Sequence, residues 1–203
     1  MQESSQISPQ DIEKLIANGL EYQNAGKIEV AKNYYRKALK ASPKEPNAVH
    51  FLGVAYHQLE DNGQAEKYLK EAVQLKPDDS QVHNHYGCAL LTLDKFSEAE
   101  QAFRKSIELN SSNADAFFNL AQLISRDKIL KQSKNDEERE KIASEAVELL
   151  NKAVTLNPKQ LEWKVILVGA LLQAGQEELA GKVLNFIRQQ KIDHPEVYFL
   201  QSR

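Results

Sequence analysis

The chain repeats one pattern of small and large apolar positions every 34 residues. The repeat shows in three pairs of matched positions: Gly53 and Gly87, Ala65 and Ala99, Leu69 and Phe103. No stretch alternates β-branched with polar residues for long, whereas Ala, Leu, Glu, Lys and Gln are plentiful. This composition favours helix and argues against strands. A period of this length predicts an all-α solenoid, in which each repeat is a helical hairpin that buries its apolar face against its neighbours.

Alignment on Pro43 and Pro77 sets the register of the units. We expect a single solenoid over 8–203, preceded by a disordered tail at 1–7, and a helix that starts at Ser8, Pro9 and Asp11. The expected units are 12–45, 46–79, 80–113, 114–160 and 161–194, followed by a terminal helix at 195–203.

Small and large residues have separate expected roles in each unit. Glycines on the first helix should let alanines of the second helix approach closely. The expected pairs are Gly19 with Ala31, Gly53 with Ala65, and Gly87 with Ala99. Large residues such as Tyr56 and Leu69 are expected to fill the space between one unit and the next.

These residues, in this order, resemble the tetratricopeptide repeat family. The second unit carries the fullest match, with Leu52, Gly53, Tyr56, Ala65, Leu69, Ala72 and Pro77. The resemblance covers most of the chain. It implies a right-handed α-α superhelix of about five hairpins plus a C-terminal helix, with a concave inner wall built mainly from the first helix of each unit.

The fourth unit holds an insertion of about 13 residues near 126–141. Tyr56 and Ala65 are 9 positions apart in the second unit, whereas the equivalent Ile124 and Ala146 are 22 apart. Alternating charges, with Ile129 and Leu130 a turn beyond Ile124, predict longer helices that form a protruding arm. Asn135 followed by Glu138 predicts the N-terminus of the second helix.

The fifth unit fits the repeat less closely. Val168 stands where the family has its small residue, while Gly169 suggests a competing register one residue later. Trp163, Tyr198 and Phe199 are interpreted as core or end-packing residues. The final segment either caps the solenoid or begins a sixth unit, and self-association through this C-terminal helix is a further possibility.

Charge, cysteine content and hydropathy exclude several classes of function. The formal net charge is −3 and the pI is about 6.0, so no basic field would attract nucleic acid. No window has the roughly 18 apolar residues of a membrane span, and the N-terminus lacks a signal peptide. Cys88 is the sole cysteine. These features predict a cytoplasmic protein that binds neither nucleic acid nor a membrane.

Amide, imidazole and apolar side chains are expected to line the inner wall. Amide groups can both donate to and accept from the backbone of a bound peptide. The expected partner-binding residues are Asn47, His50, His57, Gln81, Asn84, His85, Phe118, Asn119 and Gln122. The alternative interpretation is that these residues are simply exposed to solvent in the groove and have no natural ligand.

Two specialised branches of the family fit the residues poorly. Cochaperones that grip an acidic C-terminus use Lys, Asn and Arg at set inner positions, but Ile16 and Leu20 stand there in the first unit. The asparagine ladder of O-linked N-acetylglucosamine transferase repeats is matched by Asn119 but not by Phe51 or His85.

Catalytic and metal chemistry find little support in the residues. His50, His57, His85 and Cys88 are types that bind zinc, but they come from separate helices with nothing to fix their orientation. Cys88 beside His85 lacks a third orienting group for nucleophilic catalysis. No phosphate-binding loop or zinc-protease motif occurs. We therefore expect no catalytic residues, no metal and no cofactor.

The sequence as a whole predicts a non-catalytic scaffold or adaptor that binds a peptide or partner protein along its concave groove. The alternative is the N-terminal regulatory or substrate-docking region of a larger enzyme such as a glycosyltransferase, because such enzymes in the family follow repeats of this kind.

Overall fold

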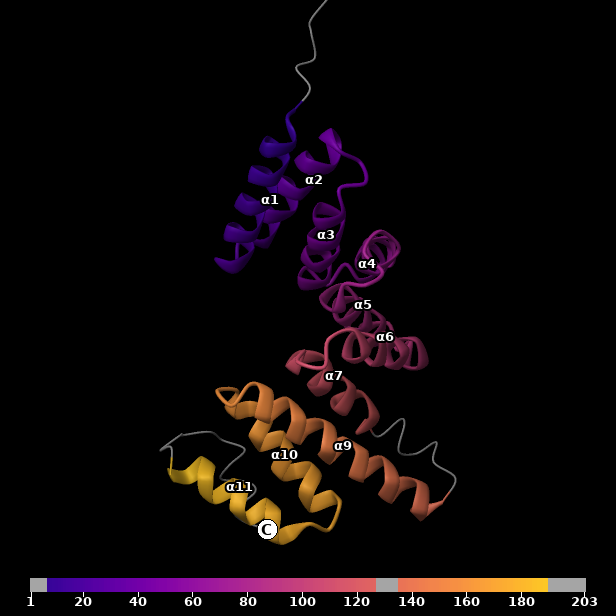
Figure 1. The fold of residues 1–203 in the computed structure, drawn as a ribbon, viewed down its shortest axis with the longest axis vertical. Helices are drawn as coiled ribbons and strands as arrows, with labels where there is room; N and C mark the ends of the chain where they lie inside the picture. Colours follow the sequence, from indigo (N-terminus) through magenta and orange to yellow (C-terminus); the bar gives the residue numbers. More distant parts are fainter. Residues whose placement is uncertain (1–6, 127–134, 190–203) are drawn as a thin grey trace, which may run out of the picture. The chain divides into compact units, whose positions relative to one another are not determined.

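A computed structural model describes residues 7–126 and 135–189, and within them it contains ten α-helices and no strand (Figure 1). The helices pair in chain order into five hairpins, which agrees with the fold class expected from the repeat. They are α1 (Pro9–Asn24) with α2 (Ile28–Ala41), α3 (Pro46–Gln58) with α4 (Asn62–Leu75), α5 (Ser80–Thr92) with α6 (Phe96–Leu109), α7 (Ala114–Ile124) with α9 (Asp136–Leu156), and α10 (Leu161–Gln173) with α11 (Glu177–Gln189).

The chain divides into two compact units, Met1–Lys105 and Ser106–Arg203, so the division falls inside α6. No described helix is both long and apolar enough to cross a membrane. The expected tail at 1–7, apart from its last residue, and the terminal helix at 195–203, including Tyr198 and Phe199, lie outside the described residues.

Short polar side chains cap the N-termini of α1, α4 and α5. The Ser8 side chain accepts a hydrogen bond from the backbone N–H of Asp11 at 3.2 Å, and Pro9 follows at the first helical position. Asp61 caps α4, and Asp79 caps α5 by accepting from the backbone N–H groups of Gln81 and Val82. Each cap satisfies N–H groups that have no partner inside the helix. The expected helix start at Ser8, Pro9 and Asp11 is therefore present.

The nearest neighbours of the first-helix glycines are large residues of the second helices, which the expected pairing with alanines did not include. A Cβ at Gly53 would lie 2.7 Å from Leu69 Cγ, and one at Gly87 would lie 2.6 Å from Phe103 Cε1. At Gly19 the nearest atom is Tyr35 Cε1, at 2.4 Å. Leu69 therefore packs inside its own hairpin, and the core cluster that contains it also includes Ala89 of the next hairpin. The alanines pack too, since Ala31, Ala65 and Ala99 are fully buried.

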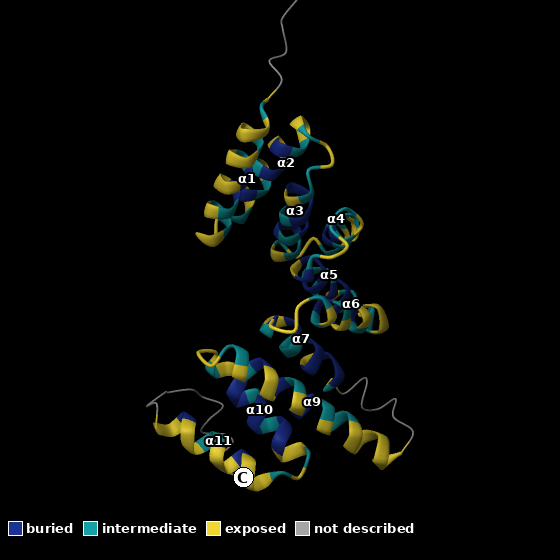
Figure 2. Ribbon diagram, in the orientation of Figure 1, coloured by how far each residue is buried: buried dark blue, intermediate teal, exposed yellow. Residues whose placement is uncertain are grey.

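Burial follows the hairpin seams in both units (Figure 2). The core of the first unit gathers alanine, aliphatic and aromatic residues from the first two hairpins, together with Ala89 of α5. In the second unit, the core joins residues of α7, α9, α10 and α11, including Leu150, Val168 and Ile187. A single hairpin cannot enclose such a cluster, so neighbouring hairpins within each unit stabilise one another.

The insertion lengthens one helix of the fourth hairpin. Helix α9 has 21 residues, against 14 in α2 or α4. Its N-cap is Asn135, whose side chain accepts from the backbone N–H of Glu138 at 2.8 Å, as the sequence predicted. Helix α7 ends at Ile124, and the expected continuation through Ile129 and Leu130 lies outside the described residues.

The fifth hairpin follows the first of its two possible registers. Val168, at the small-residue position, is 1% exposed and belongs to the core. A Cβ at Gly169 would meet no atom within 4 Å. Gly169 is therefore an open position and does not make the close helix contact that a shifted register would require. Trp163 is buried and stacks on Phe118 with ring centroids 4.6 Å apart, as expected for a core residue.

One contact recurs at two of the turns between hairpins. His83 Nε2 lies 2.7 Å from the carbonyl oxygen of Pro77, and Lys164 Nζ lies 2.5 Å from that of Pro158. Both donors stand six residues after the proline and both are buried. Because a carbonyl oxygen only accepts, His83 must carry its proton on Nε2. These side chains tie the turn to the helix that follows it, a role the repeat pattern did not indicate.

Candidate functional site

The nine residues expected to bind a partner fall into three groups by exposure. Asn47, Gln81 and Gln122 are exposed; His57, His85, Phe118 and Asn119 are half-buried; His50 and Asn84 are buried, at 2% and 3% exposed. His50, Asn84 and Phe118 occupy one repeat position, the fifth residue of the first helix. Within their own units, His50 contacts His85 of the next first helix and Phe118 stacks on Trp163 of the next first helix. The side chains of His50 and Asn84 thus contribute to packing, and a binding role for any of the nine remains a prediction.

An open groove of about 670 Å³ lies between α1 and α3 in the first unit. We call it the α1–α3 groove. Its apolar side chains are Ile12, Ile16, Leu20 and Phe51, and its polar ones include Glu13, Glu45 and Asn47. These residues come from the first helices of two successive hairpins and from the turn before α3, so regular stacking of hairpins creates the groove.

The second unit has an equivalent groove of about 410 Å³ between α7 and α10, the α7–α10 groove. Its lining includes Gln122, Ser125, Arg126, Ile166, Gly169 and Gln173. The open space around Gly169 forms part of it. The two grooves therefore differ in chemistry: the first combines apolar side chains with carboxylates, and the second combines amides with a guanidinium group.

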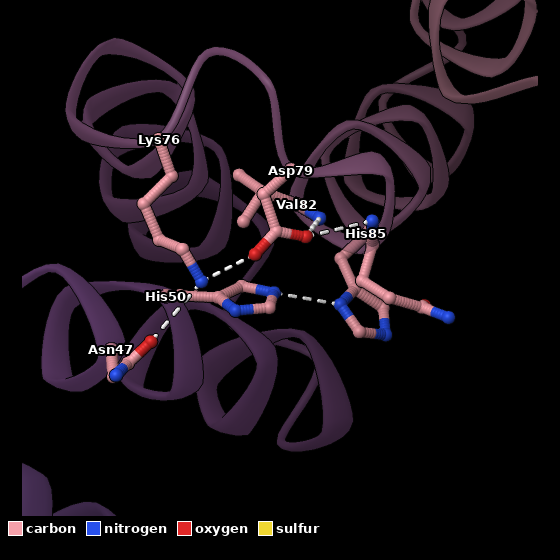
Figure 3. A network of polar contacts seen from close by, with 7 residues as sticks. Asn47, His50, Lys76, Asp79, Val82 and His85 are labelled. Atoms are coloured by element: carbon pink, nitrogen blue, oxygen red, sulfur yellow. Dashed lines mark hydrogen bonds and ion pairs between the residues drawn. The ribbon is translucent and has the colours of Figure 1, made fainter. Parts of the chain in front are cut away.

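A histidine pair joins α3 to α5 (Figure 3). His50 Nε2 lies 2.8 Å from His85 Nδ1, so one ring donates and the other accepts. His50 Nδ1 is buried without a hydrogen-bond partner, as is His57 Nε2. An unpaired N–H costs more than an unpaired lone pair, which favours His50 Nε2–H as the donor to His85.

Burial keeps these imidazoles neutral. Loss of hydration, reinforced by His85, lowers the pKa of His50 to about 3. Loss of hydration, reinforced by His57, lowers the pKa of His85 to about 4. The pKa of His57 is also lowered by burial, although a hydrogen bond to the Cys88 backbone opposes the change.

A charged network anchors the turn next to the pair. Lys76 forms an ion pair with Asp79 and donates to the side-chain oxygen of Asn47 at 3.1 Å (Figure 3). Asp79 also caps α5. Partial burial raises the pKa of the Asp79 carboxyl, but the hydrogen bonds and charge from Lys76 together with the capping N–H groups outweigh it, so the pKa is lowered. Asn47 is thereby held at the edge of the α1–α3 groove.

The histidines and Cys88 do not assemble into a metal site within the described residues. No group of three or more His, Cys, Asp or Glu side chains in that part of the chain could hold a metal ion. His85 is turned toward His50, which occupies its Nδ1.

The nine-residue set omitted several groove residues. Phe51, Glu45, Ile166 and Gln173 line the two grooves but were not among the expected binding positions. Phe51 and Ile166 share the sixth position of their first helices, one residue after His50. Their shared repeat position is the signal that could have found them, although it does not hold in every hairpin, because His85 is the sixth residue of α5 and lies against His50.

Comparisons with known proteins agree with the repeat pattern. A family model described as the cilia and flagella-associated protein 70 middle TPR-like domain matches residues 56–191, and a tetratricopeptide repeat model matches residues 16–80. No curated protein matches the sequence significantly.

Solved structures of similar fold include the following three proteins. Pseudomonas aeruginosa pilF is 21% identical with a TM-score of 0.76, covering 93% of this chain and 80% of its own. YrrB, described as a TPR protein with an unusual peptide-binding site, is 16% identical with a TM-score of 0.66, covering 93% and 91%. A mutant O-GlcNAc transferase of Thermobaculum terrenum is 19% identical with a TM-score of 0.60, covering 70% of this chain and 26% of its own. At these identities the likeness shows a shared fold. With hairpins, register and family models in agreement, the chain belongs to the tetratricopeptide repeat proteins, in the family of the CFAP70 middle TPR-like domain.

Proposed function

We propose that this protein is a non-catalytic scaffold that binds a peptide or partner protein against the first-helix grooves of its hairpins. The observation that carries the proposal is that each unit has an open groove between two successive first helices, with volumes of about 670 and 410 Å³. Concave sites with apolar walls and a few polar groups are where ligands bind. YrrB, of the same fold, is described as having a peptide-binding site.

The exposed amides suit a bound main chain. Gln122 lies in the α7–α10 groove and Asn47 in the α1–α3 groove, and each carries both a donor and an acceptor. Because the grooves lie on rigid helices, binding would order the ligand more than the protein and lose less entropy. The expected cytoplasmic location and self-association remain predictions that belong to this proposal.

Filling each groove with a bulky side chain tests the proposal. Ala17→Tyr fills the α1–α3 groove from an exposed position of α1, and Gly169→Tyr fills the α7–α10 groove where a new side chain meets no neighbour. The matched controls are Asn18→Tyr, next along α1, and Gly63→Tyr, an equally open glycine of α4 outside both grooves.

The measurement is affinity capture of partners from the source cells, with circular dichroism to confirm folding. Partners held by the unchanged chain and by both controls should be lost with a groove variant. If neither groove variant loses a partner that the controls keep, binding occurs elsewhere and the proposal is wrong.

A second candidate function is the regulatory or substrate-docking region of a larger enzyme. The Thermobaculum terrenum transferase favours it, because the likeness spans only 26% of that chain. The test is whether the natural reading frame continues past Arg203 into a catalytic domain.

A further inference from the structure

The α1–α3 groove combines an apolar floor with negative charge. Ile16, only 7% exposed, lies at its base, and half-buried Ile12, Leu20 and Phe51 pack against the same core. Glu13 and Glu45 are the charged residues of its lining, and no Lys, Arg or His contributes to that lining. The groove thus offers apolar contact area beside two carboxylates.

Two lysines near the groove each pair with an acidic residue. Lys14, next to Glu13 in sequence, pairs with Asp11 at 3.7 Å. Lys76 is held by Asp79 and Asn47. Within the described part of the chain neither Glu13 nor Glu45 forms an ion pair, so no close partner neutralises their charges. The local field therefore favours a cation on the ligand.

Asn47 adds a directional group to the groove. Lys76 donates to its side-chain oxygen, which fixes the amide orientation and leaves the NH₂ group as the donor that Asn47 can offer (Figure 3). A peptide carbonyl is the natural acceptor for such a donor. An extended main chain could therefore lie across the groove with its apolar side chains on Ile16 and Phe51.

We propose that the α1–α3 groove binds a short segment of a partner protein that carries large apolar residues next to Lys or Arg. The proposal rests on the scaffold function above and specifies its ligand. Burial of the apolar side chains supplies affinity. Glu13 and Glu45 supply the preference for a basic ligand, because an acidic segment would place like charges together.

A random dodecapeptide library displayed on phage, selected against the full chain, tests the ligand class. The selected peptides should be enriched in Leu, Ile, Phe or Trp beside Lys or Arg. Synthetic peptides from the pool should bind at least tenfold more weakly to Glu13→Lys/Glu45→Lys, and more weakly at 0.5 M salt, because salt screens exposed charges.

Two further variants keep the test interpretable. Glu13→Gln/Glu45→Gln removes the charges with little change in shape and should also weaken binding of the basic peptides. This variant keeps the test valid if the double lysine variant does not fold. Glu71→Lys/Glu148→Lys makes the same change in net charge on α4 and α9, outside the groove, and should leave binding unchanged.

The outcomes separate this proposal from the scaffold function. If the selected peptides are acidic or uncharged, the proposed ligand class is wrong. It is also wrong if basic peptides bind with the same affinity to the Glu13 and Glu45 variants. Neither result would contradict the proposed scaffold function. A selection that enriches no peptide at all would count against both. A doubled mass in light scattering that the Glu13→Lys/Glu45→Lys variant abolishes would assign the groove to a second copy of the chain and overturn the proposal.

Discussion

His50 Nε2 and His85 Nδ1 lie 2.8 Å apart, and this contact links the first helices of two successive hairpins through side chains that burial keeps uncharged. His50 Nδ1 has no partner in the same seam. A proton on either ring would place a cation beside the other imidazole, with Lys76 near and Asp79 as the neighbouring anion. Because protonation of either ring is unfavourable in the folded state, the pair should make the first unit less stable as the pH falls.

The first prediction is that the stability of the first unit falls with acidification below about pH 6.5. The pKa of His50 is about 3 and that of His85 about 4 in the folded chain, against 6.5 for the free side chain. The unfolded chain therefore takes up protons first as the pH falls. Each histidine contributes fully above pH 6.5 and lowers the free energy of unfolding by about 1.4 kcal/mol per pH unit between 6.5 and its folded pKa.

Urea unfolding of the unchanged chain and of His50→Leu/His85→Leu at several pH values checks this. Carboxylates also titrate in acid, so the quantity to compare is the difference between the two proteins. The free energy of unfolding of the unchanged chain minus that of the variant should be constant from pH 7 to 8 and should fall steadily below pH 6.5. Parallel curves over the whole range would show that the pair is not held neutral by burial.

The second prediction concerns the close approach at Gly53. In Gly53→Ala the new Cβ would lie 2.7 Å from Leu69 Cγ and 3.1 Å from the Leu69 backbone nitrogen, so the two helices must separate. We expect a loss of roughly 1–3 kcal/mol in the free energy of unfolding, and a larger loss for Gly53→Leu.

Gly63→Ala is the matched control, because a Cβ there meets nothing within 4 Å. Its stability should stay the same or rise by up to about 1 kcal/mol, since alanine favours helix more than glycine does. Thermal melting followed by circular dichroism measures both. Equal melting temperatures for the two variants would mean that the packing of Leu69 over Gly53 is wrong.

Much of this fold was predictable from one sequence because the repeat constrains the same position several times. The hairpins, the cap at Ser8 and the restart at Asn135 follow from local residue types. The residue of the second helix that packs against each small position of the first helix could not be predicted from the sequence. Periodicity marks Gly53 as a small position, but whether Ala65 or Leu69 fills the space depends on the rotation of the second helix.

The candidate site was less predictable for the same reason. Neighbouring positions on a first helix differ by about 100° in direction, so His50 lies in the seam while Phe51, the next residue, lines the groove. Because their side chains are polar, the sequence suggested that His50 and Asn84 face a ligand. Their burial instead reflects contacts between helices, such as the His50–His85 pair, that no single repeat reveals.

The third prediction concerns a buried hydrogen bond in the second unit. Asn113 Nδ2 donates to Ser106 Oγ at 2.9 Å, and the Asn113 side-chain oxygen accepts from the backbone N–H of Ala116 at the start of α7. Ser106 is fully buried and stands where Ala38 and Ala72 stand in earlier hairpins, so the position tolerates alanine in shape. Ser106→Ala should cost roughly 1–3 kcal/mol, because it leaves a buried donor without this partner.

A double-mutant cycle separates this bond from the helix cap. Asn113→Ala loses the cap as well and should cost more than Ser106→Ala. The two changes together should cost less than their sum, with a coupling of about 0.5–1.5 kcal/mol by urea unfolding. Simple additivity would show that the two side chains stabilise the fold independently.

The fourth prediction concerns the start of α9. The Asn135 side chain accepts from the Glu138 N–H at 2.8 Å, and the first turn that follows contains Asp136, Glu137 and Glu138. Asn135→Ala removes the acceptor and should destabilise the first turn of α9 by about 1 kcal/mol, while Asn135→Asp keeps an acceptor and should have a much smaller effect. Because the first turn of α9 is exposed, the effect should be local: hydrogen exchange should speed up in that turn but not around Leu150, in the buried part of the helix. Faster exchange at Leu150 as well would mean that α9 opens as one unit and that its N-cap stabilises the hairpin as a whole.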